Sequence, residues 1–162
     1  EEGRLRDYIA GTDEDALLRT AIRLHNAYRL PEEMDDRTRM FCQILRDADK
    51  IDILRVNVET PMEQIYNVST EALRQSPVSP AVLDAFYEHH CVLRTLNHYP
   101  ADNAVGHASF VFELCYPESL RAVAEQGWLW KLLDFKTENP DTAKAFAGMK
   151  AEMQQWLEEH AK

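Results

Sequence analysis

Apolar residues recur three or four positions apart along most of the chain, the spacing that places them on one face of an α-helix. The strict apolar–polar alternation of a half-buried strand is not the dominant pattern, and only five glycines are present. Prolines and polar turns separate the periodic segments. The pattern predicts an all-α fold with the end of a helix in residues 1–10, a short helical stretch after Pro61, and helices over residues 13–28, 36–56, 80–99, 100–116, 118–126, 127–135 and 140–162.

The last predicted helix shows its packing face most clearly. It begins at Asn139-Pro140, a cap residue followed by a first-turn proline. One stripe of this helix carries Phe146, Met149, Met153, Trp156 and His160. Such a stripe usually docks onto the body of a domain. Residues 76–80, which contain two prolines, predict a loop and a candidate hinge.

The composition excludes several classes of function. Hydrophobic residues make up 45% of the 162 positions and charged residues 28%, as in a soluble globular protein. The net charge of −10 argues against nucleic acid as a partner, because phosphate backbones are bound by clustered Lys and Arg. No apolar run approaches the roughly 20 residues needed to span a bilayer, and no leader pattern opens the chain. We therefore expect a cytoplasmic protein without a membrane partner, whose three cysteines are reduced core thiols.

Two carboxylates fall within the apolar pattern of the helix predicted over residues 36–56. At about 100° per residue, Asp52 lies in the middle of the apolar face and Asp49 on its flank, one turn earlier. Asp47 and Lys50 are expected to point toward water. The predicted apolar face itself consists of Phe41, Ile44, Leu45, Ala48, Ile51 and Val56.

A carboxylate inside an apolar stripe needs compensation for its lost hydration. A cation, strong hydrogen-bond donors or a raised pKa would supply it. A divalent metal is one solution for Asp49 and Asp52. The alternative is a helix that tilts its acidic edge into solvent or pairs it with Arg46 or Arg55.

A histidine lies on the apolar face of the helix predicted over residues 13–28. His25 shares that face with several leucines, and a lone histidine there is more often a hydrogen-bonded core residue than a ligand. If this helix packs against the acidic one, the imidazole and the carboxylates form a mixed nitrogen and oxygen donor set that suits a divalent cation. His107, which follows Gly106 in an apolar segment, is either a core histidine or a residue approaching the same site.

The runs AIRLHNAYRLP at 21–31 and ILRDADKIDIL at 44–54 resemble the corresponding passage of bacterial HD-domain hydrolases, an all-α superfamily of metal-dependent phosphohydrolases. Asp102 with FVFELCYPESL at 110–120 is similar to the C-terminal helical extension of one subgroup. The resemblance touches most of residues 13–135. It implies a partial HD-like helical bundle over residues 1–60, with a helical extension over 61–162 packed on it as a single structural unit.

The resemblance also implies roles for particular residues. The aspartate of the Ala-Asp-Lys step is the family's last metal ligand, which falls on Asp49. Asp52, three residues later, would face the substrate or support the site as a catalytic residue, and His25 would bind a second metal or the substrate phosphate. The implied cofactor is a divalent ion (Mn, Mg, Fe, Ni or Zn). The implied partner is a small phosphorylated substrate, for which the candidate contacts are Asn26, Arg23, Arg29 and Arg46.

The chain departs from the family at its most characteristic feature. The complete site uses an earlier histidine and a His-Asp dipeptide, and none of the six histidines here is followed by Asp. We expect the missing residues to lie upstream in a longer protein; a degenerate relative is the alternative. The sequence thus predicts hydrolysis of a phosphate ester of a nucleotide or small metabolite by the intact protein, with this chain alone inactive.

Two other functions stay open. One is a non-catalytic helical binding or regulatory module that retains an HD scaffold. The other is an unrelated helical interaction domain whose acidic face binds a basic partner. The sequence also leaves the oligomeric state open, with a homo-oligomer among the alternatives.

Overall fold

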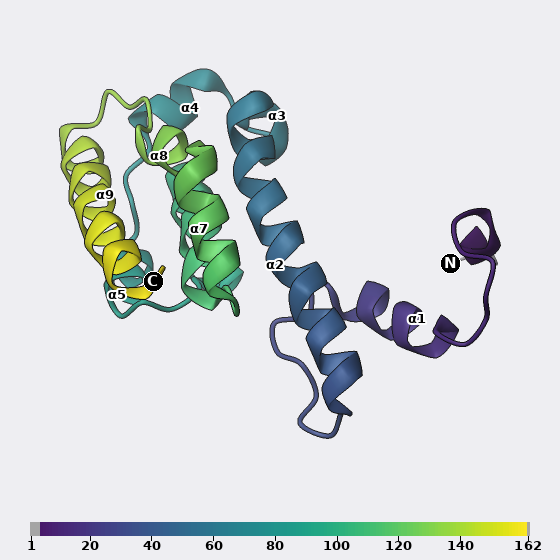
Figure 1. Ribbon diagram of the computed structural model, residues 1–162. Coiled ribbons are helices and arrows are strands. Elements are labelled where there is room, and N and C mark those ends of the chain that lie inside the picture. Colours follow the sequence, from purple (N-terminus) through teal and green to yellow (C-terminus); the bar gives the residue numbers. More distant parts are fainter. Residues whose placement is uncertain (1–3, 162) are drawn as a thin grey trace. The chain divides into compact units, whose positions relative to one another are not determined.

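The structure, a computed structural model, describes residues 4–161, so the first three residues of the predicted helix end at 1–10 lie outside the described part (Figure 1). The chain divides into two compact units, residues 1–49 and 50–162. The division falls inside one helix, α2 (Asp36–Glu59), between Asp49 and Lys50. Every regular element over residues 4–161 is helical, which confirms the all-α prediction.

The first unit contains a 3-10 turn, η1 (Arg4–Asp7), helix α1 (Asp15–Leu24) and the beginning of α2. Helix α1 ends four residues before the predicted end at 28, and the chain then turns toward Pro31. Helix α2 begins behind a side-chain cap, because Oδ1 of Asp35 accepts a hydrogen bond from the backbone N–H of Thr38 at 2.9 Å. This bond holds the pKa of the Asp35 carboxyl below its ordinary value.

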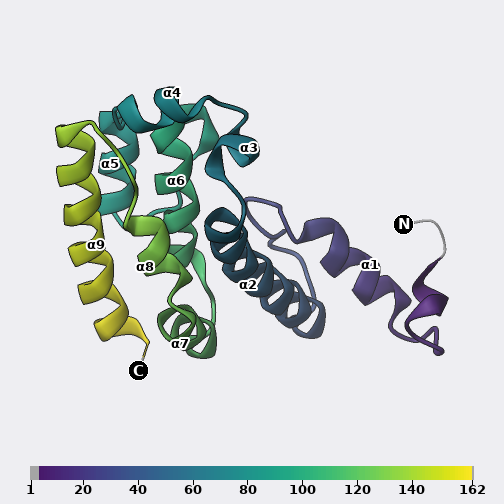
Figure 2. The same cartoon turned by 90° about the horizontal axis from the view of Figure 1, so that it is seen from above.

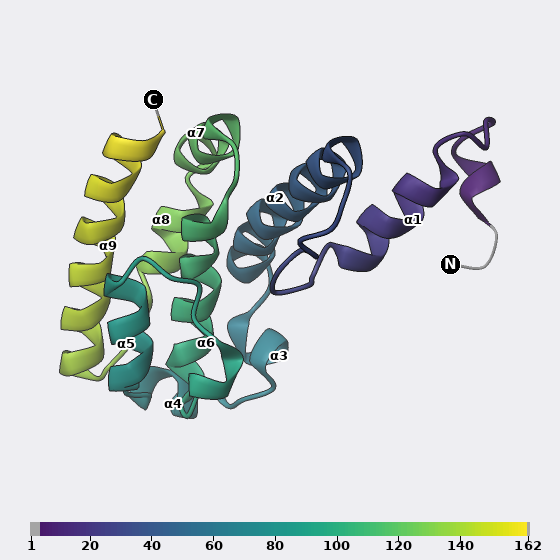
Figure 3. The ribbon, with the colours of Figure 1, turned by 90° about the horizontal axis from the view of Figure 1, so that it is seen from below.

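The second unit is a layered helical bundle around α6. Its elements after α2 are α3 (Met62–Tyr66), α4 (Thr70–Gln75), α5 (Pro80–Tyr87), η2 (Arg94–Leu96), α6 (Pro100–Ala108), η3 (Ser109–Glu113), α7 (Pro117–Gln126), α8 (Trp128–Leu133) and α9 (Pro140–His160). Helix α6 packs against α4, α5 and α8, while α9 packs against α5, α7 and α8. Figure 2 shows α9 beside α5 and α8, and Figure 3 shows the same neighbours from the opposite side.

The apolar core of the second unit is formed mainly by α5, α6, α8 and α9. Its fully buried members include Val82, Phe86, Val105, Leu129, Leu132, Met149 and Met153. The predicted stripe on α9 is therefore confirmed for Met149 and Met153, and Phe146 is buried with them. At the end of the helix Leu157 is buried instead of His160, which is exposed and stacks on Trp156 at 4.3 Å between ring centroids.

Helix α5 ends at Tyr87, well before the predicted end at 99. His89 adopts a left-handed conformation with φ of 58°, and its N–H donates to the carbonyl of Phe86 at 3.0 Å. The N–H of His90 donates to the carbonyl of Ala85, also at 3.0 Å. These two bonds form a Schellman C-cap, which satisfies the last carbonyls of the helix and turns the chain away.

Three further features bear on the expectations from sequence. Gly127, with φ of 73°, separates α7 from α8. Cys42 and Cys91 are buried, as predicted for core thiols, whereas Cys115 is exposed. Within residues 4–161, no helix is both long enough and apolar enough to cross a bilayer.

Candidate functional site

The buried face of α2 differs from the one that sequence spacing predicts. Its buried positions are Cys42, Arg46, Asp47, Leu54 and Asn57. The prediction that Asp47 points toward water is wrong, since only 2% of this residue is exposed, whereas Ile44 of the predicted apolar face is 50% exposed. Lys50, also expected in water, has only 11% of its side chain exposed, with Nζ 3.5 Å from a carboxylate oxygen of Glu113.

Asp52 lies on the exposed side of α2, with 59% of its side chain accessible to solvent. Its Oδ1 accepts a hydrogen bond from Nε of Arg55 at 2.9 Å and lies 2.8 Å from a terminal nitrogen of the same guanidinium, as an ion pair. Arg55 also pairs with Glu59 one turn later. The expected place of Asp52 in the middle of a buried apolar face is therefore wrong. Solvent and Arg55 together satisfy its charge, which is one of the alternatives that the sequence left open.

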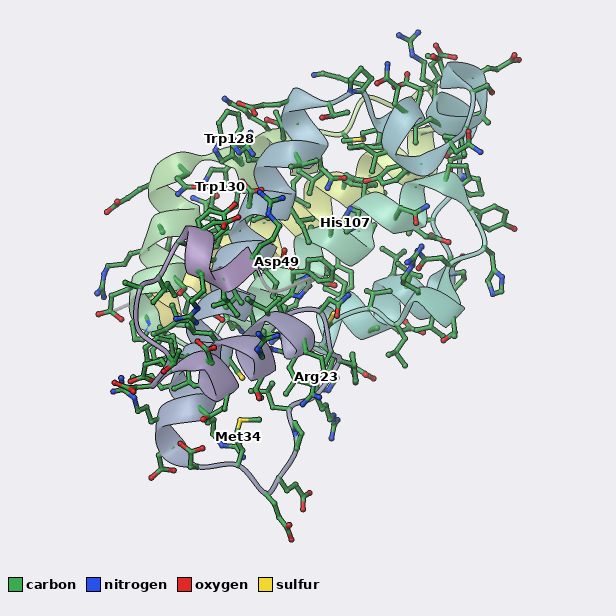
Figure 4. All side chains as sticks on the ribbon, turned by 90° about the vertical axis from the view of Figure 1, so that its right-hand side faces the viewer. Arg23, Met34, Asp49, His107, Trp128 and Trp130 are labelled. Carbon is green, nitrogen blue, oxygen red and sulfur yellow. The ribbon has the colours of Figure 1, made fainter. Side chains whose placement is uncertain are left out.

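Asp49 lies on α2 in the first unit and is half-buried (Figure 4). Among the described residues, its carboxylate has neither a hydrogen-bond donor nor an ion-pair partner. A half-buried carboxylate without a donor retains a strong preference for a cation. Of the two predicted acidic site residues, Asp49 is thus the one whose carboxylate is available to a ligand.

His25 forms the C-cap of α1, in the same unit as Asp49. Its Nδ1 lies 2.7 Å from the carbonyl oxygen of Ile22, which can only accept, so Nδ1 carries the proton. The lone pair is then on Nε2, the atom that a neutral imidazole offers to a metal or a phosphate hydroxyl. No hydrogen bond joins His25 to Asp49. Asn26, the next residue, is exposed.

The three candidate arginines have different surroundings. Arg46 is buried, and its guanidinium donates to the carbonyls of Ala27 and Tyr28, which fixes the chain just after α1. Arg29 is exposed and lies 5.7 Å from the ring centroid of Tyr28. Arg23, labelled in Figure 4, is exposed on α1 and lines a groove next to η1. Arg46 therefore has a structural role, which leaves Arg29 and Arg23 as the exposed cations.

The described residues do not complete a metal site. A protein site for a catalytic divalent cation generally supplies three or more side-chain ligands. Over residues 4–161 no group of three His, Cys, Asp or Glu side chains could hold a metal ion. The first unit offers two candidate donors, the carboxylate of Asp49 and Nε2 of His25, which are fewer than such a site needs.

The second unit contains a buried polar cluster that the sequence did not reveal. Oδ1 of Asn57, on α2, accepts hydrogen bonds from the hydroxyl of Tyr66 and, at 2.9 Å, from Nδ1 of His107. Nδ2 of the same amide donates to the carbonyl of Ile53 at 2.8 Å, which fixes its orientation. The cluster joins the end of α2 to α3 and α6, elements that are up to 50 residues apart in sequence.

The members of this cluster are held in their neutral forms. Burial, together with a smaller effect of the positive charge of Arg94, lowers the pKa of His107 to about 4. Burial also raises the pKa of the Tyr66 hydroxyl above its ordinary value. Since Nδ1 donates to Asn57, Nε2 of His107 is an acceptor. The earlier interpretation of His107 as a core histidine agrees with these contacts.

Asp102, which belongs to the segment similar to the C-terminal extension of one HD subgroup, has contacts that give it a structural role. It is fully buried near the start of α6. Its carboxylate accepts hydrogen bonds from the N–H and hydroxyl of Ser79, at 2.8 and 2.6 Å, and from the backbone N–H groups of His98 and Tyr99, each at 2.9 Å. Four donors compensate the desolvation of the charge. Asp102 thus ties the beginning of α5 to the beginning of α6.

Comparison of the chain with models of known protein families, with curated proteins and with solved structures found no match.

Proposed function

We propose that this chain is a helical part of a metal-dependent phosphohydrolase similar to the HD superfamily, acting on a phosphate ester of a nucleotide or small metabolite. The supporting observation is the environment of the Asp49 carboxylate. Its carboxylate is half-buried and has no partner among the described residues, at the position where the resemblance expects a metal ligand. Within the same unit, Nδ1 of His25 bonds the carbonyl oxygen of Ile22, so Nε2 is the ring nitrogen left to bind a ligand.

The proposal assigns different tasks to the other candidates. Arg29 is the exposed cation beside the loop that follows α1, and Asn26 is an exposed amide in the same loop, so both could reach a phosphate from solvent. Arg46 holds the backbone of this loop through Ala27 and Tyr28. Asp52, paired with Arg55, acts as a supporting residue instead of a ligand. The proposal requires further metal ligands from outside the described residues.

The test compares two isosteric substitutions in the whole protein that contains this chain. Phosphate-ester hydrolysis is measured with p-nitrophenyl phosphate and a panel of nucleotides, in the presence of Mn²⁺ or Mg²⁺. Asp49→Asn keeps the shape of the side chain and removes its charge, so we expect kcat/KM to fall by at least about 100-fold. The control is Asp84→Asn, which changes an exposed aspartate of α5. Equal activity of Asp49→Asn and the wild type would refute the proposal.

A second candidate function is a non-catalytic binding or regulatory module on the same helical scaffold. It is favoured by the ion pair of Asp52 with Arg55, which leaves only Asp49 and His25 as candidate donors in the described chain. The same assay separates the two functions. If the folded protein hydrolyses none of the esters with either metal, the second candidate replaces the first.

A further inference from the structure

The first unit contains a surface groove between η1 and α1. It has a volume of about 520 Å³, and all of its lining residues lie between Arg4 and Arg23. The two elements are connected by an ion pair between Arg6 and Asp15 outside the lining. Five apolar side chains contribute most of the lining surface: Leu5, Tyr8, Ile9, Leu18 and Ile22.

Several of these apolar side chains are unusually open to solvent. Tyr8 is 81% exposed, Ile22 47% and Ile9 37%. Single exposed apolar residues are normal on a protein surface, but a contiguous group of them indicates an interaction surface. The exposure also argues against a small-molecule pocket, since such pockets bury most of their ligand. The groove is therefore suited to a larger partner that covers it from outside.

Arginines line one side of this groove. Arg19 and Arg23 are exposed, and among the described residues neither guanidinium has a carboxylate partner. The third lining arginine, Arg4, pairs with Asp7. The complete chain carries a net charge of −10, so these two cations form a local positive surface on an acidic protein. A partner that supplies carboxylates would complete their ion pairs.

The spacing of the lining residues on α1 defines the shape of that partner. Leu18 and Ile22 lie four residues apart, and so do Arg19 and Arg23, so an apolar row and a cationic row run side by side along the helix. A second helix that lies along α1 repeats its side chains at the same four-residue interval, which is about 6 Å along the axis. The apolar stripe of this second helix would cover the apolar row of α1, and acidic residues beside the stripe would reach the cationic row.

We propose that this groove binds an acidic amphipathic helix of another protein. Helix-in-groove recognition uses anchors spaced at three and four residues, as the row of Leu18 and Ile22 requires. The inference does not depend on the proposed phosphohydrolase activity, since no assay of hydrolysis enters its test.

The experiment measures binding of defined peptides to the full chain by fluorescence anisotropy. The acidic probe is a labelled helix-forming peptide of about 16 residues with an apolar stripe flanked by glutamates. A second probe has lysine at each glutamate position. The groove variant is R19E/R23E. The matched control is R74E/R121E, which makes the same change of charge at two exposed arginines of the second unit.

We expect the acidic probe to bind the wild type and R74E/R121E equally, and to bind R19E/R23E at least about tenfold more weakly. The lysine probe should show the reverse preference and favour R19E/R23E. I22D should also weaken binding of the acidic probe. Because Ile22 is exposed, the helical circular dichroism spectrum of this variant should be unchanged.

Three outcomes would overturn the inference. One is no binding of the acidic probe to the wild type at millimolar concentration. Another is an equal loss of binding in R19E/R23E and R74E/R121E, which would show only a general effect of net charge. The third is a dimer in sedimentation velocity that I22D dissociates, which would assign the groove to a second copy of the chain.

Discussion

Nδ1 of His107 lies 2.9 Å from Oδ1 of Asn57, and this contact joins α6 to the end of α2 inside the second unit. The hydrogen bond determines the tautomer of the imidazole, and burial determines its charge. The cluster of His107, Asn57 and Tyr66 is neutral at physiological pH. Its stability should therefore depend on pH in a defined direction.

The first prediction concerns this pH dependence. The pKa of His107 is about 4 in the folded protein, below the ordinary value of 6.5, so the unfolded chain binds the proton more readily. The contribution of His107 is complete above about pH 6.5 and is lost as the pH falls toward 4. The loss should reach at most about 3 kcal/mol of unfolding free energy. Urea unfolding at several pH values measures it, and His107→Gln should flatten the curve between pH 6.5 and 4.

The second prediction concerns the amide of Asn57. Asn57→Ala removes the acceptor of two largely buried donors on partly exposed residues, the Tyr66 hydroxyl and Nδ1 of His107. We expect the unfolding free energy to fall by about 2–4 kcal/mol, because each unsatisfied buried group costs about 1–3 kcal/mol. Tyr66→Phe removes one donor and leaves no orphan, so its cost should be about 1 kcal/mol. Similar losses in the two variants would show that the cluster does not depend on the amide.

The third prediction concerns the carboxylate of Asp102. Asp102→Asn introduces an NH₂ group where four donors converge, so at least one donor loses its acceptor and repulsion is added. The expected loss is about 3–5 kcal/mol of unfolding free energy. Asp84→Asn, at an exposed position of α5, is the control and should change stability by less than about 0.5 kcal/mol. Thermal unfolding that is the same for both variants would contradict the structural role of Asp102.

The fourth prediction compares two glycines. Gly127 has φ of 73°, a conformation that is unfavourable for alanine, so Gly127→Ala should destabilise the chain by about 1 kcal/mol. Gly106 lies inside α6, and a Cβ atom there would meet no other atom within 4 Å. Gly106→Ala should therefore stabilise by about 0.5–1 kcal/mol through helix propensity. Chemical denaturation of both variants tests the pair, and shifts of the same sign would be inconsistent with it.

The sequence pattern was sufficient to predict the all-α class and the first residues of most helices. Pro80, Pro100 and Pro140 each open a helix where the sequence predicts one, because proline suits the first turn and no position further inside. Helix ends were harder to predict. The end of α5 depends on His89 in a left-handed conformation, which is uncommon for a residue other than glycine and has no clear signal in sequence.

The faces of α2 could not be predicted from spacing alone. Apolar residues occur on several sides of this helix, so more than one stripe satisfies a period of 3.6 residues. The chosen stripe contained Ile44, which is exposed, and omitted Leu54, which is buried. Because the predicted apolar stripe is the wrong one, the sequence puts Asp52 on a buried face. Its pairing with Arg55 is then only an alternative.

The polar cluster was missed for a different reason. Asn57 and His107 are 50 residues apart and come together only through tertiary packing. Gly106-His107 in an apolar segment was the sole local signal, and it left open whether His107 is a core histidine or approaches the acidic site, without indicating its partners. The role of Asp49 stays a prediction, because its carboxylate has no contact in the described chain that would assign it.

The continuity of α2 has a practical consequence for dissecting this protein. The boundary between the two units falls at Asp49 and Lys50, in the interior of the helix, so a truncation there would leave four backbone N–H groups without their carbonyl acceptors. A truncation that starts at Asp35 keeps the natural cap on Thr38 and the complete helix. Expression of the second unit for biophysical work should therefore begin at Asp35, even though residues 35–49 of the first unit are carried along.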